Sequence, residues 1–142
     1  MTTSPVHELR LALTVDDYDR ALAFYRDAFG LPVLEEWSGK RGSGAVLGAG
    51  RATLELLSTA QADLVDEVEV GRRVAGPVRI ALEVDDSANT AEELVAAGAE
   101  LVGAGPVVTP WHHRNVRLRA PDRMQLTLFT PVVHPTEPRA TT

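Results

Sequence analysis

At four positions in predicted strands, a polar or charged residue lies between two apolar neighbours. Arg10 and Arg79 lie in Leu-Arg-Leu and Val-Arg-Ile, and Glu55 and Thr127 lie in Leu-Glu-Leu and Leu-Thr-Leu. Because side chains alternate across a strand, we expect all four to point away from the face that their neighbours bury. A guanidinium donates hydrogen bonds to a carbonyl, phenolate or carboxylate but has no lone pair for a metal ion. Only Glu55 in this set is a metal ligand of useful strength.

Aromatic residues make up only 5% of the chain, so the two tryptophans stand out. Trp37 and Trp111 are candidate stacking platforms for a ligand, since tryptophan is enriched at recognition sites. The alternative is that each is an ordinary core residue. Phe129 has the same strand parity as Thr127, so it is expected to line the same site.

The pair His112-His113 begins another strand. Adjacent strand residues point to opposite faces, so the two imidazoles cannot easily chelate one ion. We expect one of them, His113, to face the site as a hydrogen-bonding group or general base. The alternative is a surface pair at a loop-to-strand junction. The arginines that follow, at 114, 117, 119 and 123, form a local basic stripe. This stripe indicates a solvated strand face, or a wall of the site in the case of Arg117.

The chain contains an internal repeat that must position these residues. The octamer 10–17 recurs as 79–86, with six of the eight residues identical and an offset of 69 residues. Each copy is followed by a helical pattern that ends in glycine, over 18–30 and 88–98. The repeated octamer and the helical pattern that follows each copy occur in the same order, which indicates a duplicated unit.

Each unit is predicted to run strand, helix, then further strands. The aspartate pair after each first strand caps the helix. The helical spacing of Ala21, Leu22, Tyr25 and Phe29 predicts a buried stripe, and Phe24 is assigned to the same core. We predict a first module over 1–58, a linker over 59–76 with room for a short helix, a second module over 77–131 and a disordered tail over 132–142, the whole forming one compact domain.

Composition excludes several classes of protein. The formal net charge of -6 disfavours nucleic-acid partners. No apolar run is long enough for a membrane span, and the N-terminus lacks the features of a secretory signal. The chain has no cysteine, which excludes disulfides and thiolate metal sites. A cytoplasmic protein is expected.

The ordered set of these features resembles the vicinal oxygen chelate superfamily, which includes glyoxalase I, extradiol dioxygenases, epimerases and bleomycin-resistance proteins. The resemblance covers about residues 7–130. Trp111-His112-His113-Arg114 followed by Pro121-Asp122 is most similar to the bleomycin-resistance branch, although Arg123 stands where the family usually has glycine in the turn. The implied fold is α+β, with two tandem βαβββ repeats that form a rolled, cup-shaped mixed sheet with helices outside.

In this family a metal ion sits between the two half-cups, held by one side chain on the first strand and one on the last strand of each repeat. Those positions correspond to Arg10, Glu55, Arg79 and Thr127. Arginine repels a cation, so we predict that no metal and no other cofactor is bound. Two interpretations of these residues are compatible with each other. In the first, an Arg10-Glu55-Arg79 ion bridge fills the family's metal site; in the second, one arginine stays free to bind a ligand.

The sequence thus favours a metal-free protein that sequesters a small aromatic molecule, such as an antibiotic or natural product, and that forms homodimers. The alternatives are an enzyme of the same superfamily (a lyase, isomerase or dioxygenase-like protein) and a module without a ligand. The expected ligand-binding residues are listed together: Arg10, Trp37, Glu55, Arg79, Trp111, His113, Arg117, Thr127 and Phe129.

Overall fold

The computed structural model describes residues 5–132, so the tail expected to be disordered lies, except for its first residue, outside the described residues. In chain order the described elements are β1 (Glu8–Val15), α1 (Tyr18–Leu22), η1 (Ala23–Ala28), β2 (Val33–Gly39), β3 (Gly42–Ala49), β4 (Ala52–Ser58), α2 (Thr59–Glu69), β5 (Val78–Glu83), α3 (Ser87–Ala96), β6 (Glu100–Leu101), β7 (Val107–Val108), β8 (His113–Arg119) and β9 (Gln125–Pro131).

One mixed sheet joins the two repeats. The strand order is β2-β3-β4-β1-β5-β9-β8-β6, and β7 also pairs with β8. Within each repeat the first and last strands run parallel, β1 with β4 and β5 with β9. The repeats meet where β1 and β5 pair antiparallel. The predicted α+β fold with two tandem repeats is confirmed.

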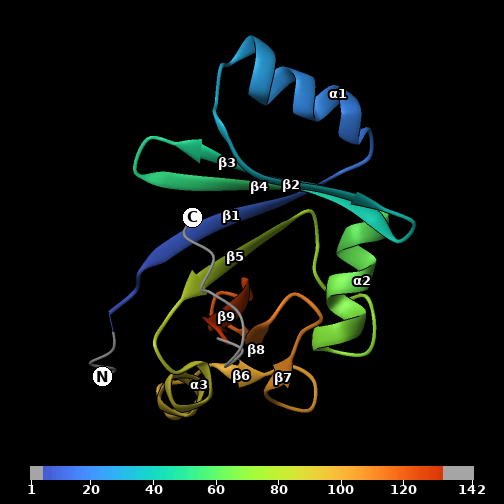
Figure 1. Cartoon of the computed structure of the whole chain (residues 1–142). Coiled ribbons are helices and arrows are strands. Elements are labelled where there is room, and N and C mark those ends of the chain that lie inside the picture. The colour runs from blue at the N-terminus through green and yellow to red at the C-terminus, as the bar shows by residue number, and fades with distance from the viewer. Residues whose placement is uncertain (1–4, 133–142) are drawn as a thin grey trace.

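The helices of the two repeats lie on the outside of the rolled sheet. Figure 1 shows α1 against the sheet of the first repeat and α3 against that of the second. Leu22 packs on Leu47 and Leu56 in the first repeat, and Ala91 packs on Leu118 and Leu128 in the second. Each repeat therefore has its own outer core, which leaves the inner face of the sheet free to form a cup.

The predicted helix caps are present. Asp17 accepts a hydrogen bond from the backbone N–H of Arg20 at 3.1 Å, and Asp86 accepts one from Asn89 at 3.0 Å. Each cap satisfies one of the free amides at a helix start. The identical Val-Asp-Asp motifs thus begin equivalent helices in the two repeats.

The predicted buried stripe of the first helix is only partly right. Leu22 is buried, and Tyr25 packs against the same core, but Phe24 and Phe29 are 55% and 68% exposed. The reason is a π-helical turn, η1, in which the Phe29 N–H donates to the carbonyl of Phe24, five residues back. The wider turn rotates the following side chains off the stripe that a 3.6-residue period predicts.

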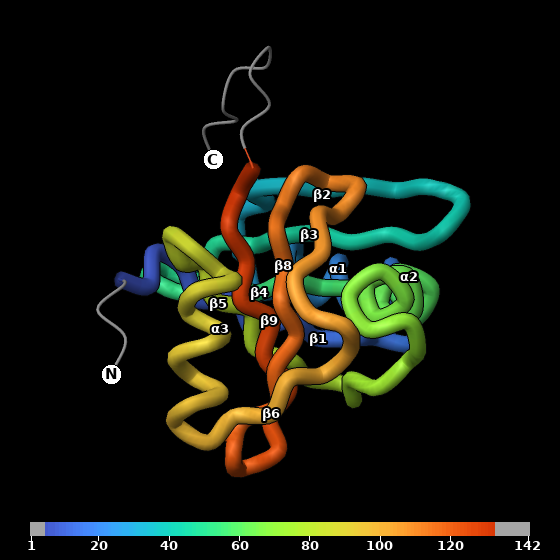
Figure 2. The backbone as a smooth tube through the Cα atoms, turned by 90° about the horizontal axis from the view of Figure 1, so that it is seen from below, coloured from blue at the N-terminus to red at the C-terminus, as the bar shows by residue number. Residues whose placement is uncertain are grey.

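The segment 59–76, expected as a linker, contributes the helix α2. The side chain of Ser58 caps it by accepting from the N–H of Gln61 at 3.2 Å. Figure 2 shows α2 beside the β1–β4 and β8 region, where it closes one side of the cup. Gly42 permits this close approach, because a Cβ at that position would lie 2.4 Å from the backbone nitrogen of Gln61. None of the described helices is long and apolar enough to cross a membrane.

Candidate functional site

The strand register brings the four sequence-predicted positions onto one face. At the β1–β5 seam Arg10 lies opposite Ala81, and Ala12 lies opposite Arg79. Glu55 pairs with Ala12, and Thr127 pairs with Ala81. The side chains therefore form two rows across the strands, Arg10–Ala81–Thr127 and Glu55–Ala12–Arg79, each with an alanine at its centre. The small alanine side chains leave space between the charged groups, so the floor of the cup is polar and open.

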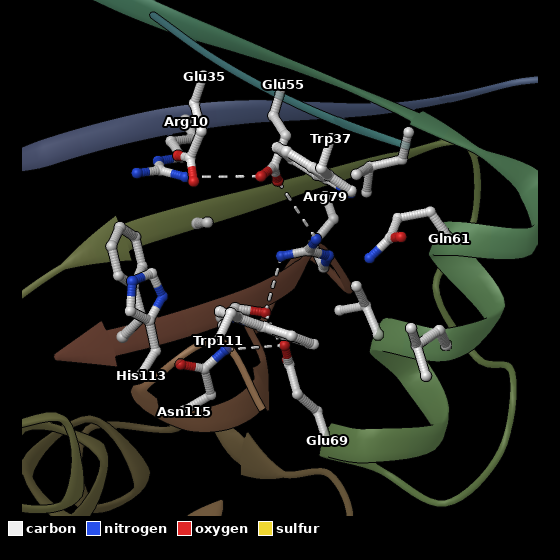
Figure 3. Close-up of a pocket in the computed structure, with 16 residues that line it drawn as sticks. Arg10, Glu35, Trp37, Glu55, Gln61, Glu69, Arg79, Trp111, His113 and Asn115 are labelled. Carbon is white, nitrogen blue, oxygen red and sulfur yellow. Dashed lines mark hydrogen bonds and ion pairs between the residues drawn. The ribbon is translucent and has the colours of Figure 1, made fainter. Parts of the chain in front are cut away.

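Above this floor is a cavity of about 380 Å³, within the range of small-molecule sites. Eight of the nine expected site residues line it: Arg10, Trp37, Glu55, Arg79, Trp111, His113, Thr127 and Phe129. Figure 3 shows Arg10, Glu55 and Arg79 reaching into the cavity from the sheet, with Gln61 and Glu69 entering it from α2. The cavity brings them together, and their ligand-binding role stays a prediction.

The two tryptophans belong to the cavity wall. Trp37 on β2 pairs with Gly44 on β3, and a Cβ at Gly44 would lie 2.1 Å from the indole ring. Only glycine therefore lets the ring lie flat across the neighbouring strand. Trp111 is in the turn before β8, and the view of Figure 3 has the two indoles on either side of the Arg79 side chain.

Arg10 is closely held by its neighbours. Its Nε and one terminal nitrogen donate to the carboxylate of Glu8 at 3.0 and 3.2 Å. Its guanidinium carbon lies 5.1 Å from the centre of the Phe129 ring. Burial acts to lower the pKa of Arg10, but the negative charge of Glu55 and Glu8 outweighs burial and raises it. Arg10 is thus a fixed cation within a carboxylate clamp.

Glu55 lies between the two arginines of the floor. Its oxygens are 3.6 Å from a nitrogen of Arg10 and 3.8 Å from a nitrogen of Arg79. Burial raises the pKa of Glu55, and the charges of Arg79 and Arg10 oppose that shift. The predicted Arg10-Glu55-Arg79 bridge exists, but both contacts exceed ordinary hydrogen-bond length.

Arg117 is the one expected site residue that does not line the cavity. Its side chain is fully buried, 2.9 Å from Asp66 and 3.0 Å from Glu69. Sequence reasoning placed it on the wall of the site because its strand parity is right. The structure instead pairs it with two carboxylates of α2, of which Glu69 lines the cavity and Asp66 does not, so Arg117 belongs to a buried ion-pair cluster behind the cavity wall.

These carboxylates connect α2 to the cup floor. Glu69 accepts from Thr127 at 2.8 Å and from Asn115 at 3.0 Å, and Thr127 accepts from Arg79 at 2.9 Å. Asp66 accepts from the backbone N–H groups of Val74 and Ala75. Burial would raise the pKa of Asp66, yet these amides and Arg117 outweigh it and hold the pKa below its usual value.

Of the two histidines, His113 faces the cavity and His112 does not. His112 is exposed in a turn with φ of +66°, a left-handed conformation, so the expected strand begins only at His113. His113 stacks on Phe129 with ring centres 5.0 Å apart. Burial, followed by the charge of Arg10, lowers the pKa of His113 to about 4. His113 is therefore neutral at physiological pH and can donate or accept one hydrogen bond.

Sequence reasoning missed the contribution of α2 to the site. Gln61, Leu64, Val65 and Glu69 all line the cavity, as do Glu35 and Asn115 from β2 and β8. The capping serine at position 58 and the spacing of Ala62 and Val65 were signals for an amphipathic helix there. Two carboxylates of this helix, Asp66 and Glu69, are buried, and no local pattern distinguishes a buried carboxylate from an exposed one.

The residues at the four family metal positions do not fit a metal ion. Arginine cannot ligate, Thr127 already bonds to Arg79 and Glu69, and Glu55 is one carboxylate between two cations. Within residues 5–132, no group of three or more His, Cys, Asp or Glu side chains is arranged to hold a metal ion.

Solved structures with the same fold include enzymes and proteins of unstated function. A methylmalonyl-CoA epimerase from Mycobacterium tuberculosis superposes with a TM-score of 0.64 at 20% identity, covering 94% of this chain and 93% of its own. A hypothetical protein from Bacillus halodurans superposes with a TM-score of 0.67 at 15% identity, and the match covers 99% of this chain and 100% of that one. A third similar structure is a glyoxalase/bleomycin resistance protein/dioxygenase superfamily member from Vibrio splendidus. Its TM-score is 0.59 at 13% identity, and the match covers 89% of this chain and 99% of that one. At these identities the likeness shows the fold alone.

No curated protein matches the sequence significantly. The family model of the glyoxalase/bleomycin resistance protein/dioxygenase superfamily matches residues 9–128, which span both repeats and the helix between them. The chain therefore belongs to the glyoxalase/bleomycin resistance protein/dioxygenase superfamily.

Proposed function

We propose that this protein binds and sequesters a small, flat aromatic molecule in its cup without using a metal ion, as bleomycin-resistance proteins do. The observation that carries the proposal is the replacement of the ligand set: Arg10 and Arg79 lie where metal-binding members need side chains with lone pairs. A cavity of about 380 Å³ with Trp37 and Trp111 on its wall suits a planar ligand.

Stacking and hydrogen bonding supply different parts of this binding. The two indoles offer apolar faces, and a planar ring buried against them gains dispersion and hydrophobic energy without a reaction. Phe129 lines the same cavity and supports the His113 ring by stacking on it. Arg79, Glu55 and His113 offer the few polar contacts that orient a ligand. Because His113 has a pKa of about 4, its polar contribution is that of a neutral imidazole.

The test is tryptophan fluorescence and calorimetry with bleomycin and a panel of planar natural products. We expect quenching by at least one compound and stoichiometric binding, with affinity reduced about tenfold or more in Arg79→Ala and Trp111→Ala. Arg114→Ala, on the exposed face of β8, is the matched control and should bind normally. Elemental analysis after purification with added Ni, Zn, Mn and Fe completes the test: more than about 0.5 metal per chain contradicts the proposal.

A second candidate, an enzyme that moves a proton, is favoured by one observation. Glu55 faces the cavity, and burial raises its pKa, which brings a carboxylate nearer to the range of a general base. Epimerases occur among the similar structures. Incorporation of solvent deuterium into methylmalonyl-CoA by the wild type but not by Glu55→Gln would favour this candidate over sequestration.

The expected homodimer and cytoplasmic location remain proposals. Support for a dimer comes from apolar side chains that the first repeat leaves exposed, among them Leu9, Phe24, Phe29 and Leu34. Exposed large apolar side chains of this kind can be covered when two copies of the chain associate. Sedimentation equilibrium at micromolar concentration is the test, and a monomer at all concentrations would contradict the expectation.

A further inference from the structure

Two groups on the cup floor keep hydrogen-bonding capacity that other residues do not use. Among the described residues, no group is within hydrogen-bond distance of the Glu55 carboxylate; its nearest cations are 3.6 and 3.8 Å away. Arg79 donates one hydrogen bond, to Thr127. The side chains of Glu55 and Arg79 are only 13% and 7% exposed, and both line the cavity. Because both side chains face the cavity, a bound ligand can use this capacity.

Two other charged residues that line the cavity, Arg10 and Glu69, are already hydrogen-bonded. Arg10 is clamped by Glu8, two positions before it on β1. The repeat offset of 69 residues puts Pro77 at the corresponding position before Arg79, so the second arginine has no such clamp. Glu69 accepts from Asn115, Arg117 and Thr127. Arg79 and Glu55 therefore form an adjacent donor and acceptor with unused hydrogen-bonding capacity. Glu35, which is exposed, and the buried Asn115 Oδ1 are further acceptors at the cavity that no described residue uses.

The arrangement discriminates between ligand charges. A nitrogen of Arg79 lies 3.8 Å from an oxygen of Glu55, so a ligand that reaches one of these side chains also meets the other. A carboxylate ligand would pair with Arg79 but be repelled by Glu55, and an ammonium ligand would have the reverse problem. A neutral group with an N–H beside a C=O satisfies both: the N–H donates to Glu55 and the carbonyl accepts from Arg79.

We propose that the cup recognises a neutral planar heterocycle with a lactam edge, a cis N–H and C=O, read by Glu55 and Arg79 while its ring lies against the tryptophans. In the view of Figure 3, the Arg79 side chain lies between Trp37 and Trp111, and the Glu55 side chain points down toward Arg79. This inference rests on the proposed function, since it names the class of ligand for the same site.

Two isomeric probes isolate the hydrogen-bonding edge. 4-Methylquinolin-2(1H)-one keeps the lactam N–H, and 1-methylquinolin-2(1H)-one blocks it with the same number of atoms; 2-naphthoate is the anionic probe. The two indole N–H resonances of Trp37 and Trp111 report binding in nitrogen-15 NMR titrations. We expect the N–H lactam to bind the wild type at least about tenfold more tightly than either other probe, because a buried carboxylate left unpaired is costly.

A variant of Glu55 and a matched control variant extend the test. Glu55→Gln removes the negative charge beside both arginines, so the lactam preference should fall and 2-naphthoate should become the tighter ligand. Glu36→Gln, on the exposed part of β2 and outside the cavity lining, should leave the wild-type order unchanged. Circular dichroism spectra of both variants check that they are folded.

The outcomes separate the inference from the proposed function. Equal affinity of the two isomers, with both shifting the indole resonances, would overturn the lactam edge and leave aromatic binding intact. Tighter binding of 2-naphthoate by the wild type would also overturn it, because the site would then be an anion receptor. If no probe shifts either indole, the proposed aromatic binding fails, and the inference fails with it.

Discussion

Replacing Arg117 by methionine tests whether the buried ion pair holds α2 against the cup. The change keeps most of the side-chain volume but leaves Asp66 and Glu69 without the guanidinium that lies 2.9 and 3.0 Å from them. Breaking a buried pair in this way costs about 3–5 kcal/mol. Asp66 keeps Val74, Ala75 and Arg73 as donors, and Glu69 keeps two others. We therefore expect the lower end, about 3 kcal/mol of unfolding free energy.

The assay is urea unfolding at pH 7 together with calorimetry, in which 3 kcal/mol corresponds to a decrease in Tm of about 10 °C for a domain of this size. Arg119→Met is the matched control, two residues further along β8. Arg119 is 45% exposed and pairs with Glu100, so its loss should cost less than about 1 kcal/mol. Equal effects of the two substitutions would refute the reasoning that burial makes the Arg117 pair essential.

The pH dependence gives a second check on the same pair. The pKa of Asp66 is lowered in the folded protein from an ordinary value of 3.8, so its stabilising effect is present above pH 3.8 and is lost as pH falls through the lower folded value. The difference in stability between wild type and Arg117→Met should shrink in the same acidic range. A difference that stays constant down to pH 2 would contradict this origin.

Three further predictions concern other parts of the chain. Gly44→Ala should displace the Trp37 indole, red-shift its fluorescence and cost about 1–3 kcal/mol, because the new Cβ would lie 2.1 Å from the ring. The pKa of His113 measured by NMR should be about 4, below the value of 6.5 expected in the unfolded chain. The free energy of unfolding should therefore decrease as the pH falls from 6.5 to 4, because the unfolded chain binds the proton more tightly. His113→Gln should flatten that decrease. Phe29→Ser should cost less than about 1 kcal/mol, against 2–5 for Leu22→Ala, and similar losses would contradict the exposed position of Phe29.

Strong local patterns made the fold predictable. The repeated octamer and the Val-Asp-Asp caps each depend on a few neighbouring residues, so they could be read without coordinates. The exposed aromatics at Phe24 and Phe29 could not, because a π-helical turn depends on how the helix end packs. The turn at Arg123 could be recognised as unusual, and Arg123 does adopt φ of +73°, where glycine would be unstrained.

The site divides in the same way. Strand parity and the internal repeat identified Arg10, Arg79, Glu55 and Thr127 as one facing group, because a period of two is a local property of strands. The partner of each charged group can be far away in sequence. Glu69 accepts hydrogen bonds from Arg117, 48 residues away, and from Asn115, 46 residues away. No local pattern encodes such a distance.

The sequence by itself thus determined the repeat, the fold and the absence of a ligand set at the four family metal positions, since these follow from residue types and short-range spacing. Only the tertiary structure decided how these charges pair: Arg10 donates to Glu8, Arg79 donates to Thr127, and Glu55 lies between the two arginines beyond ordinary hydrogen-bond length. The physical reason is that pairing among buried charges is settled by distances of a few ångström between strands and a helix, which depend on how the whole chain packs.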